Sequence, residues 1–260
     1  MHWIKVDTER CKSDGVCVAV CPARILFLNE KGFPEDIPEG QCILCGHCAA
    51  VCAHDALTHT GLAEETYLPI AKEPLPPAVM DGFLMSRRSV REFKDRPVGR
   101  EVLEALLEVA RRAPTGSNSQ KLHWIVVEGV RKVYALSEEA MNWFRTTDLP
   151  KARLEQWEKG HDFILRGAPA VIVACAPADY VWAKQDCAIA LTFLELAAEA
   201  RSLGVCWTGY LTRAAAAHSP LCKALSVPEG HVVCGGLMIG ERKYTYKKIP
   251  PRKPLSVQWL

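Results

Sequence analysis

The sequence predicts an α+β protein in which a small cysteine-rich domain precedes a larger one. Seven of the twelve cysteines fall before residue 53 in two similar runs, and the remaining chain mixes helical with strand-like apolar patterns. Between the two parts, YLPIAKEPLPP at 67–77 contains four prolines, as is typical of an extended linker. We therefore expect domains at 1–66 and 81–260, joined by a linker at 67–80.

The cysteine-rich part contains two runs with the spacing of iron-sulfur ligands. In CILCGHCAAVC the spacing is C-x2-C-x2-C-x3-C, in which three thiolates bind one cluster and the fourth reaches a neighbouring cluster. The upstream run, CKSDGVCVAVCP, repeats these offsets with Asp14 in the second slot. The pattern predicts a two-cluster ferredoxin domain with the ligands Cys11, Asp14, Cys17, Cys21, Cys42, Cys45, Cys48 and Cys52.

Crossed ligation is usual for this arrangement and sorts the ligands into two sets. The first, for a 4Fe-4S cluster, is Cys21, Cys42, Cys45 and Cys48. The second is Cys11, Cys17 and Cys52 with Asp14, which leaves open a 4Fe-4S cluster with a carboxylate or water ligand, or a 3Fe-4S cluster. Zinc is the alternative, but it needs only four ligands per site, and seven cysteines exceed that number. Disulfides are disfavoured because the N-terminus does not resemble a signal peptide.

The charge is unevenly distributed, although the net charge is only +2. Residues 1–66 carry five Lys/Arg and ten Asp/Glu, a balance of −5, which leaves +7 on the remainder. The basic residues are scattered, so they favour a phosphate-bearing cofactor over nucleic acid. We find no apolar stretch long enough to cross a bilayer and no targeting signal, and therefore expect a cytoplasmic protein without a membrane partner.

Apolar periodicity predicts the first elements of the larger part. Residues 100–112 have the spacing of a helix, and 122–127 form a short run of β-forming residues. Residues 137–166 are expected to be helical, with breaks near Pro150 and Gly160.

Three further elements are predicted toward the C-terminus. AVIVA at 170–174 is typical of a buried strand, and 186–203 of a long helix that is apolar almost all round and closed by Gly204. The stretch 232–239 predicts another buried strand, whose glycines allow close approach of neighbouring segments.

Four polar stretches flank these elements. SRRSVREF at 86–93 places three arginines and two serines together, a combination suited to a phosphate. APTGSNSQ at 113–120 supplies small and hydroxyl side chains that could contact a polar ring edge, CWTGYL at 206–211 follows the long helix, and KKIPPRKPL at 247–255 adds positive charge.

Together these stretches resemble the nitroreductase family of FMN enzymes over most of 81–260, and the whole chain resembles the ferredoxin-fused members of that family. The resemblance implies an FMN-binding nitroreductase-like α+β domain with a central sheet, and an obligate homodimer with FMN at the subunit interface. It also implies that the arginine-serine loop and a C-terminal basic residue hold the FMN phosphate and ribityl chain, and that the Thr208-Gly209 turn offers N–H groups near flavin N5. The FMN-binding residues so implied are Arg87, Arg88, Ser89, Arg91, Pro114, Thr115, Gly116, Asn118, Thr208, Gly209, Arg252 and Lys253.

The leading functional hypothesis is an oxidoreductase whose clusters relay single electrons from an external low-potential donor, such as a ferredoxin, to FMN. Hydride transfer from FMN would then reduce a small molecule, for which the resemblance suggests a nitroaromatic, a quinone or a conjugated carbonyl. One alternative is direct reduction by NAD(P)H with auxiliary clusters, and another is a non-catalytic electron carrier or redox sensor. Cys175, Cys187, Cys206, Cys222 and Cys234 are expected to be buried thiols without a role.

Overall fold

The computed structural model describes residues 2–38, 40–62, 67–71 and 73–260 and divides into two compact units. The first unit comprises Met1–Pro74 with Ser117–Ser119, and the second comprises Leu75–Gly116 with Gln120–Leu260. Helix α3 (Pro77–Ser86) therefore begins inside the stretch 67–80 that the sequence predicted as linker. Proline at the first helical position favours this start, because its fixed φ suits the first turn and its missing N–H costs no hydrogen bond there.

The first unit consists of two similar halves. Strand β1 (Ile4–Val6) pairs with β4 (Leu57–His59), and β2 (Leu26–Leu28) pairs with β3 (Pro34–Asp36), both antiparallel. Each half has a one-turn helix, α1 (Val16–Ala19) or α2 (His47–Ala50), that begins after a left-handed glycine. The buried apolar core is small and includes two of the predicted ligands, because its members are Ile4, Cys17, Ile25, Leu26, Cys48 and Leu57.

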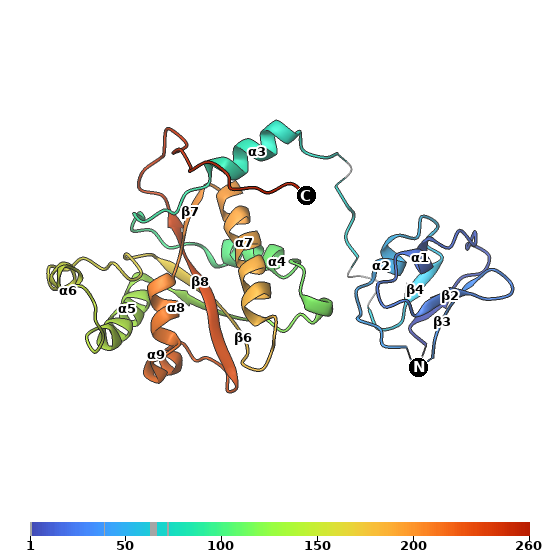
Figure 1. Ribbon diagram of the computed structural model, residues 1–260, viewed down its shortest axis with the longest axis horizontal. Coiled ribbons are helices and arrows are strands. Elements are labelled where there is room, and N and C mark those ends of the chain that lie inside the picture. Colours follow the sequence, from blue (N-terminus) through green and yellow to red (C-terminus); the bar gives the residue numbers. More distant parts are fainter. Residues whose placement is uncertain (1, 39, 63–66, 72) are drawn as a thin grey trace. The chain divides into compact units, whose positions relative to one another are not determined.

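The second unit is built on a four-stranded antiparallel sheet of order β5-β6-β8-β7 (Figure 1). The strands are β5 (His123–Glu128), β6 (Ala170–Pro177), β7 (Leu203–Trp207) and β8 (His231–Glu241). Strands β6 and β8 are the two central strands, which agrees with the apolar stretches that predicted buried strands at 170–174 and 232–239.

Helices cover both faces of this sheet (Figure 1). One core cluster joins α4 (Arg100–Ala110) and α7 (Ala183–Ala200) to the sheet. A second cluster lies on the other face with α5 (Val130–Phe144), α8 (Gly209–Ala215) and α9 (Ser219–Ala224). Two further helices are α6 (Lys151–Glu158) and the short 3-10 helix η2 (Gly116–Asn118). The division into units falls within η2, after Gly116. The α+β architecture predicted from the sequence is confirmed.

The helical prediction for 137–166 is correct only in part. Helix α5 already begins at Val130, and no helix covers 161–166. Asp162 explains the loop, because its carboxylate accepts hydrogen bonds from the backbone N–H groups of Ile164 and Leu165 at 2.9 and 3.0 Å. A side chain that binds nearby backbone donors competes in this way with the helix.

The role predicted for Gly204 is wrong. Helix α7 ends at Ala200, and Ser202 takes the left-handed backbone conformation with a φ of 60°. Gly204 lies in β7, where a Cβ atom would lie 2.6 Å from Cγ1 of Val90. The glycine therefore permits close packing of the segment before α4 against β7 and does not terminate the helix.

The sequence suggested a helix buried on all sides, but in the single chain one side of α7 is exposed. Ile189 and Phe193 each have a relative exposure of 38%, whereas Leu191 and Leu194 are fully buried. The helix thus presents an apolar strip that the described residues leave uncovered. None of the described helices combines the length and apolarity needed to cross a bilayer.

Candidate functional sites

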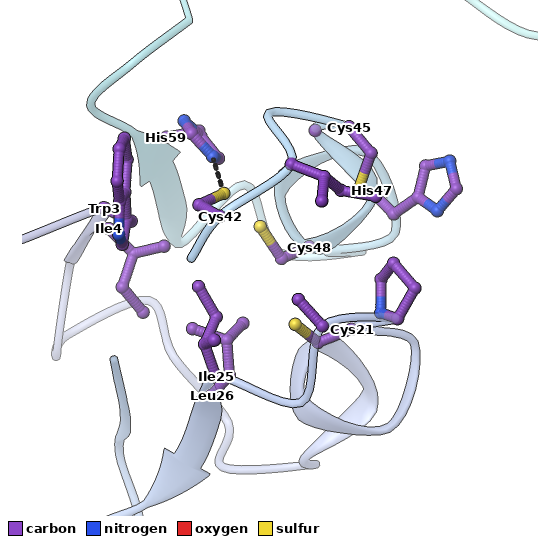
Figure 2. A pocket seen from close by; sticks show the side chains of 14 residues that line it. Trp3, Ile4, Cys21, Ile25, Leu26, Cys42, Cys45, His47, Cys48 and His59 are labelled. Carbon is purple, nitrogen blue, oxygen red and sulfur yellow. Dashed lines mark hydrogen bonds between the residues drawn. The ribbon is translucent and has the colours of Figure 1, made fainter. Parts of the chain in front are cut away.

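The first cavity of the N-terminal unit is lined by all four residues that the sequence assigned to one cluster, which are Cys21, Cys42, Cys45 and Cys48 (Figure 2). Three come from the α2 loop, and Cys21 comes from the other half of the unit. Apolar side chains such as Ile25 and Leu26 line the rest of the cavity. The set contains only thiols around a largely apolar space, which fits the ligand chemistry of an iron-sulfur cluster.

A second cavity is lined by the other predicted set, Cys11, Asp14, Cys17 and Cys52. Cys52 again comes from the opposite half, so the structure brings the residues together in the crossed arrangement. Asp14 lines this cavity, and its carboxylate accepts a hydrogen bond from the N–H of Val16 at 3.1 Å. Three thiols and a carboxylate are suited to an iron-sulfur cluster whose fourth ligand is not a cysteine.

Burial raises the pKa of several of these thiols. Burial raises the pKa of Cys48 to about 11, and it also raises the pKa values of Cys17 and Cys42. All twelve cysteines are free thiols in the structure. Because thiolates are the ligands of iron, occupation of these cavities would release protons from the cysteines.

Hydrogen bonds to ligand sulfur atoms differ between the two halves. The N–H of Ser13 lies 3.5 Å from Sγ of Cys11, and the N–H of Leu44 lies 3.4 Å from Sγ of Cys42. The N–H of Ala56 lies 3.3 Å from Sγ of Cys52, and Nε2 of His59 lies 3.3 Å from Sγ of Cys42 (Figure 2). Burial lowers the pKa of His59.

In the second unit, the predicted arginine-serine segment lies beside β7. Ser89 forms a parallel bridge with Val205, and the N–H of Val90 donates to the carbonyl of Val205 at 2.8 Å. Strand β7 leads directly into Thr208 and Gly209. The fold therefore brings together two stretches, 86–93 and 206–211, that are far apart in the sequence.

The arginines of this segment have unequal partners. Nη1 of Arg87 donates to Oε1 of Glu195 at 2.9 Å, whereas Arg88 donates through Nη1 and Nη2 to the carbonyls of Arg87 and Met85. Nε of Arg88 is buried and has no partner among the described residues. An unsatisfied buried donor in a cluster of arginines fits an anionic group such as the phosphate of FMN.

Three arginines and the buried carboxylate of Glu195 act in opposite directions on the Cys206 thiol of β7. Burial raises the pKa of Cys206, while the charges of Arg91, Arg166 and Arg87 partly offset that rise. Cys206 is 6% exposed, which is consistent with the buried thiol that the sequence predicted. Arg166, which the sequence reasoning did not select, therefore adds positive charge close to the predicted phosphate-binding segment.

The loop at 113–116 is held by a buried carboxylate. Both oxygens of Asp186 accept from the N–H of Gly116, at 3.2 and 3.1 Å, and the hydroxyl of Tyr180 donates to the same carboxylate. A Cβ on Gly116 would lie 2.5 Å from Cδ1 of Trp182. Gln120 donates its N–H to Oγ1 of Thr115 at 3.1 Å. These contacts give the loop one defined conformation.

The other residues that the sequence predicted to contact the flavin differ in burial and in hydrogen bonding. Thr208 is buried, and its N–H already donates to the carbonyl of Gly236 at 2.9 Å, so it is not available to a flavin. Among the described residues the N–H of Gly209 has no such partner. Asn118 has a left-handed φ of 52° and is grouped with the first unit. Arg252 and Lys253 are exposed in the C-terminal segment 243–260, which has no helix or strand.

Sequence reasoning missed three buried polar residues of these sites. Glu195 and Asp186 are 5% and 3% exposed, and His59 is 2% exposed. The two carboxylates stand out as charges within the otherwise apolar pattern of α7, which is a signal for buried pairing. His59 carries no local signal, because Cys42 lies 17 residues earlier in the chain and the two side chains meet only in the folded unit.

Comparisons with known proteins agree with this division of the chain. The model of the Nitroreductase family matches residues 84–241, and that of the 4Fe-4S dicluster domain matches residues 3–53. A protein of Archaeoglobus fulgidus named NADH dehydrogenase/NAD(P)H nitroreductase is 30% identical over 167 residues, which cover 62% of this chain and 83% of the relative.

Solved structures give the same result. A nitroreductase from Bacteroides fragilis with bound FMN has a TM-score of 0.60 and 25% identity, and the match covers 69% of this chain and 97% of that one. A nitroreductase from Desulfitobacterium hafniense with bound FMN has a TM-score of 0.59 and 26% identity, with coverage of 69% and 96%. The chain therefore belongs to the nitroreductase family and carries a 4Fe-4S dicluster domain at its N-terminal end.

Proposed function

We propose that this protein is an FMN-dependent oxidoreductase whose clusters deliver single electrons from a low-potential donor for the reduction of a small molecule. The observation that carries the proposal is the sorting of eight predicted ligands into two cavities in front of a nitroreductase domain. Two clusters beside one another are an arrangement suited to electron transfer and have no part in hydride chemistry itself.

The segment 86–93 and the turn at 208–209 are the candidates to hold FMN. Arg88 and Arg91 offer donors to a phosphate, and the N–H of Gly209 is the available backbone donor of the turn. Gly116, fixed by Asp186, supplies a rigid loop edge. When bound, FMN would connect one-electron input with two-electron hydride transfer.

Each cluster has its own expected ligand set. Cys42, Cys45, Cys48 and Cys21 would hold a 4Fe-4S cluster, in which every ligand is a thiolate. Cys11, Cys17 and Cys52 with Asp14 would hold the other, as a 4Fe-4S or a 3Fe-4S cluster. Iron and sulfide analysis together with Mössbauer spectroscopy distinguishes the two types.

The substrate class is proposed from the family resemblance. A nitroaromatic, a quinone or a conjugated carbonyl would accept a hydride, and an external ferredoxin would be the donor. A second candidate function is direct reduction by NAD(P)H, which the Archaeoglobus relative favours, since that protein is named as an NAD(P)H nitroreductase.

A homodimer would cover surfaces that one chain leaves exposed. Helix α3 has no buried residue, and α7 exposes Ile189 and Phe193. The C-terminal segment exposes Trp259 at 91% and Leu255 at 90%. Large apolar side chains at this density favour a second copy of the chain as the partner. A one-chain mass in light scattering at micromolar concentration would contradict this.

The deciding experiment is an anaerobic spectral titration of cluster-loaded, FMN-loaded protein. Reduced ferredoxin, NADH and NADPH are added separately, and the flavin absorbance is followed in time. Rapid bleaching by ferredoxin alone supports the relay. Rapid bleaching by a nicotinamide alone assigns the clusters an auxiliary role, and no bleaching by any of the three donors contradicts both functions.

A further inference from the structure

His59 links a predicted cluster ligand to the backbone of the following turn. It is the last residue of β4, is 2% exposed and lines the cavity of the first ligand set (Figure 2). Its Nδ1 lies 3.1 Å from the N–H of Gly61, and its Nε2 lies 3.3 Å from Sγ of Cys42.

These two contacts determine the tautomer of the imidazole. A backbone N–H can only donate, so Nδ1 of His59 must accept from Gly61 and therefore carries no proton. The proton of the neutral ring is then on Nε2, which donates it toward Cys42. Sγ of Cys42 thus receives two N–H donors, one from His59 and one from Leu44.

The other half of the unit lacks this donor. Cys11 corresponds to Cys42 in the ligand spacing, and its Sγ accepts from the N–H of Ser13 at 3.5 Å. The last residue of β2, Leu28, corresponds to His59 at the end of β4; it is apolar and 42% exposed. The set of Cys11 has its second donor at another ligand, because the N–H of Ala56 donates to Sγ of Cys52 at 3.3 Å. Among the described contacts each set therefore receives two N–H donors, and only the Cys42 set receives one from an imidazole.

We propose that His59 is a positioning residue that raises the reduction potential of the cluster held through Cys42. The inference rests on the proposed function, because it requires the cysteines to bind clusters. One-electron reduction adds negative charge to a cluster, part of which resides on the ligand sulfurs. A fixed N–H donor at such a sulfur stabilises the reduced form more than the oxidised form.

The potential of the Cys42 cluster affects where an electron resides within the unit. If the Cys42 cluster has the higher potential, an electron that enters the unit resides on this cluster in preference to the other. Leu28 supplies no comparable donor at the equivalent place. The imidazole would in this way favour residence of the electron on the Cys42 cluster.

The test is an EPR-monitored redox titration of the full-length, cluster-loaded protein. Three variants are compared with the wild type. His59→Leu introduces the same residue type as Leu28 at the equivalent position. His59→Gln keeps an N–H donor near the former position of Nε2, and His47→Leu is the control. His47 is exposed and lines the same cavity, without a described bond to a ligand sulfur, and so controls for the loss of an imidazole near the cluster.

We expect His59→Leu to change the ratio of oxidised to reduced Cys42 cluster at a given potential about tenfold, a fall of about 59 mV for a one-electron couple. His59→Gln should recover at least half of this change, while His47→Leu and the second cluster should stay at their wild-type potentials. Iron content and the EPR line shape report whether each variant keeps its clusters.

An unchanged potential in His59→Leu with full iron content would overturn the proposal, as would an equal fall in His47→Leu. If His59→Leu loses the cluster, His59→Gln decides: a near wild-type potential supports the proposal, and any other result overturns it in favour of a ligand or purely structural role. Wild-type protein that binds no cluster at all would instead refute the proposed function, and with it this inference.

Discussion

Arg87 and Glu195 form an ion pair with Nη1 and Oε1 2.9 Å apart, between the arginine-serine segment and the middle of α7. The other carboxylate oxygen of Glu195 accepts from Nε1 of Trp207 at 3.1 Å. The Glu195 side chain is only 7% exposed, and that of Arg87 is 25% exposed. One buried carboxylate thus holds the predicted phosphate-binding segment next to β7, the strand that leads into the turn of Thr208 and Gly209.

Replacement of Glu195 by Gln should destabilise the second unit by about 2 kcal/mol, because it leaves Arg87 partly buried without its counter-charge. Urea unfolding followed by tryptophan fluorescence measures the change. Glu128→Gln is the matched control, since its pair with Arg100 is largely exposed and solvent screens the attraction, so the effect on stability should be smaller. Equal effects of the two substitutions would show that the Glu195 pair has no special structural role.

Gly236→Ala should destabilise the protein by about 2 kcal/mol through overpacking. A Cβ at this position would lie 2.8 Å from Oγ1 of Thr208 and 2.9 Å from the carbonyl oxygen of Ile172. Gly82→Ala in α3 is the control, because nothing lies within 4 Å of its Cβ position and alanine favours a helix. Thermal unfolding compares them, and a neutral Gly236→Ala would contradict the close approach of β8 to Thr208.

Asp186→Asn should weaken FMN binding about threefold to tenfold, because the amide offers only one acceptor to Gly116 and Tyr180. Quenching of FMN fluorescence on titration with FMN-free protein gives the dissociation constant. Asp179→Asn removes an exposed carboxylate from the same connection and should leave the constant unchanged. A constant that Asp186→Asn does not alter would mean that the loop at Gly116 does not contact the flavin.

Cys234 should react as a thiolate near neutral pH. A hydrogen bond from Cys187 lowers the pKa of Cys234 to about 7, and the same contact raises the pKa of Cys187. The rate of alkylation of Cys234 by iodoacetamide should therefore rise through pH 7 and level off above it. In Cys187→Ala the midpoint should move to higher pH, toward an ordinary thiol. Peptide mass spectrometry across pH identifies the modified residue, and identical profiles would exclude the contact.

Cys45→Ala should lower ferredoxin-driven turnover at least tenfold while the FMN content stays unchanged, because it removes one thiolate from the first ligand set. Cys222→Ala, outside both cavities, is the matched control. Stopped-flow reduction of the flavin by reduced ferredoxin measures the transfer directly. Survival of wild-type rates in Cys45→Ala without the cluster would show that electrons reach the flavin by another route.

From the sequence alone one can predict the two sets of residues that line the cavities of the first unit, the presence of two parts and the central strands of the sheet. Ligand spacing is a local property, since a few residues of loop decide which thiols can reach a common metal centre. Strands β6 and β8 were similarly predictable, because a strand buried on both faces needs an uninterrupted apolar run. The arginine-serine segment is predicted to bind a phosphate from its composition alone.

Only the tertiary structure decided which polar groups meet. Glu195 and Asp186 acquire their partners because α7 packs against segments that lie many residues away in the chain. His59 meets Cys42, which lies 17 residues earlier in the chain, and Gly204 lies in a strand because β7 pairs with β8. Periodicity and spacing describe neighbours along the chain, whereas the burial of a charge, the choice of a tautomer and the available space beside a glycine depend on contacts that form when distant segments pack together.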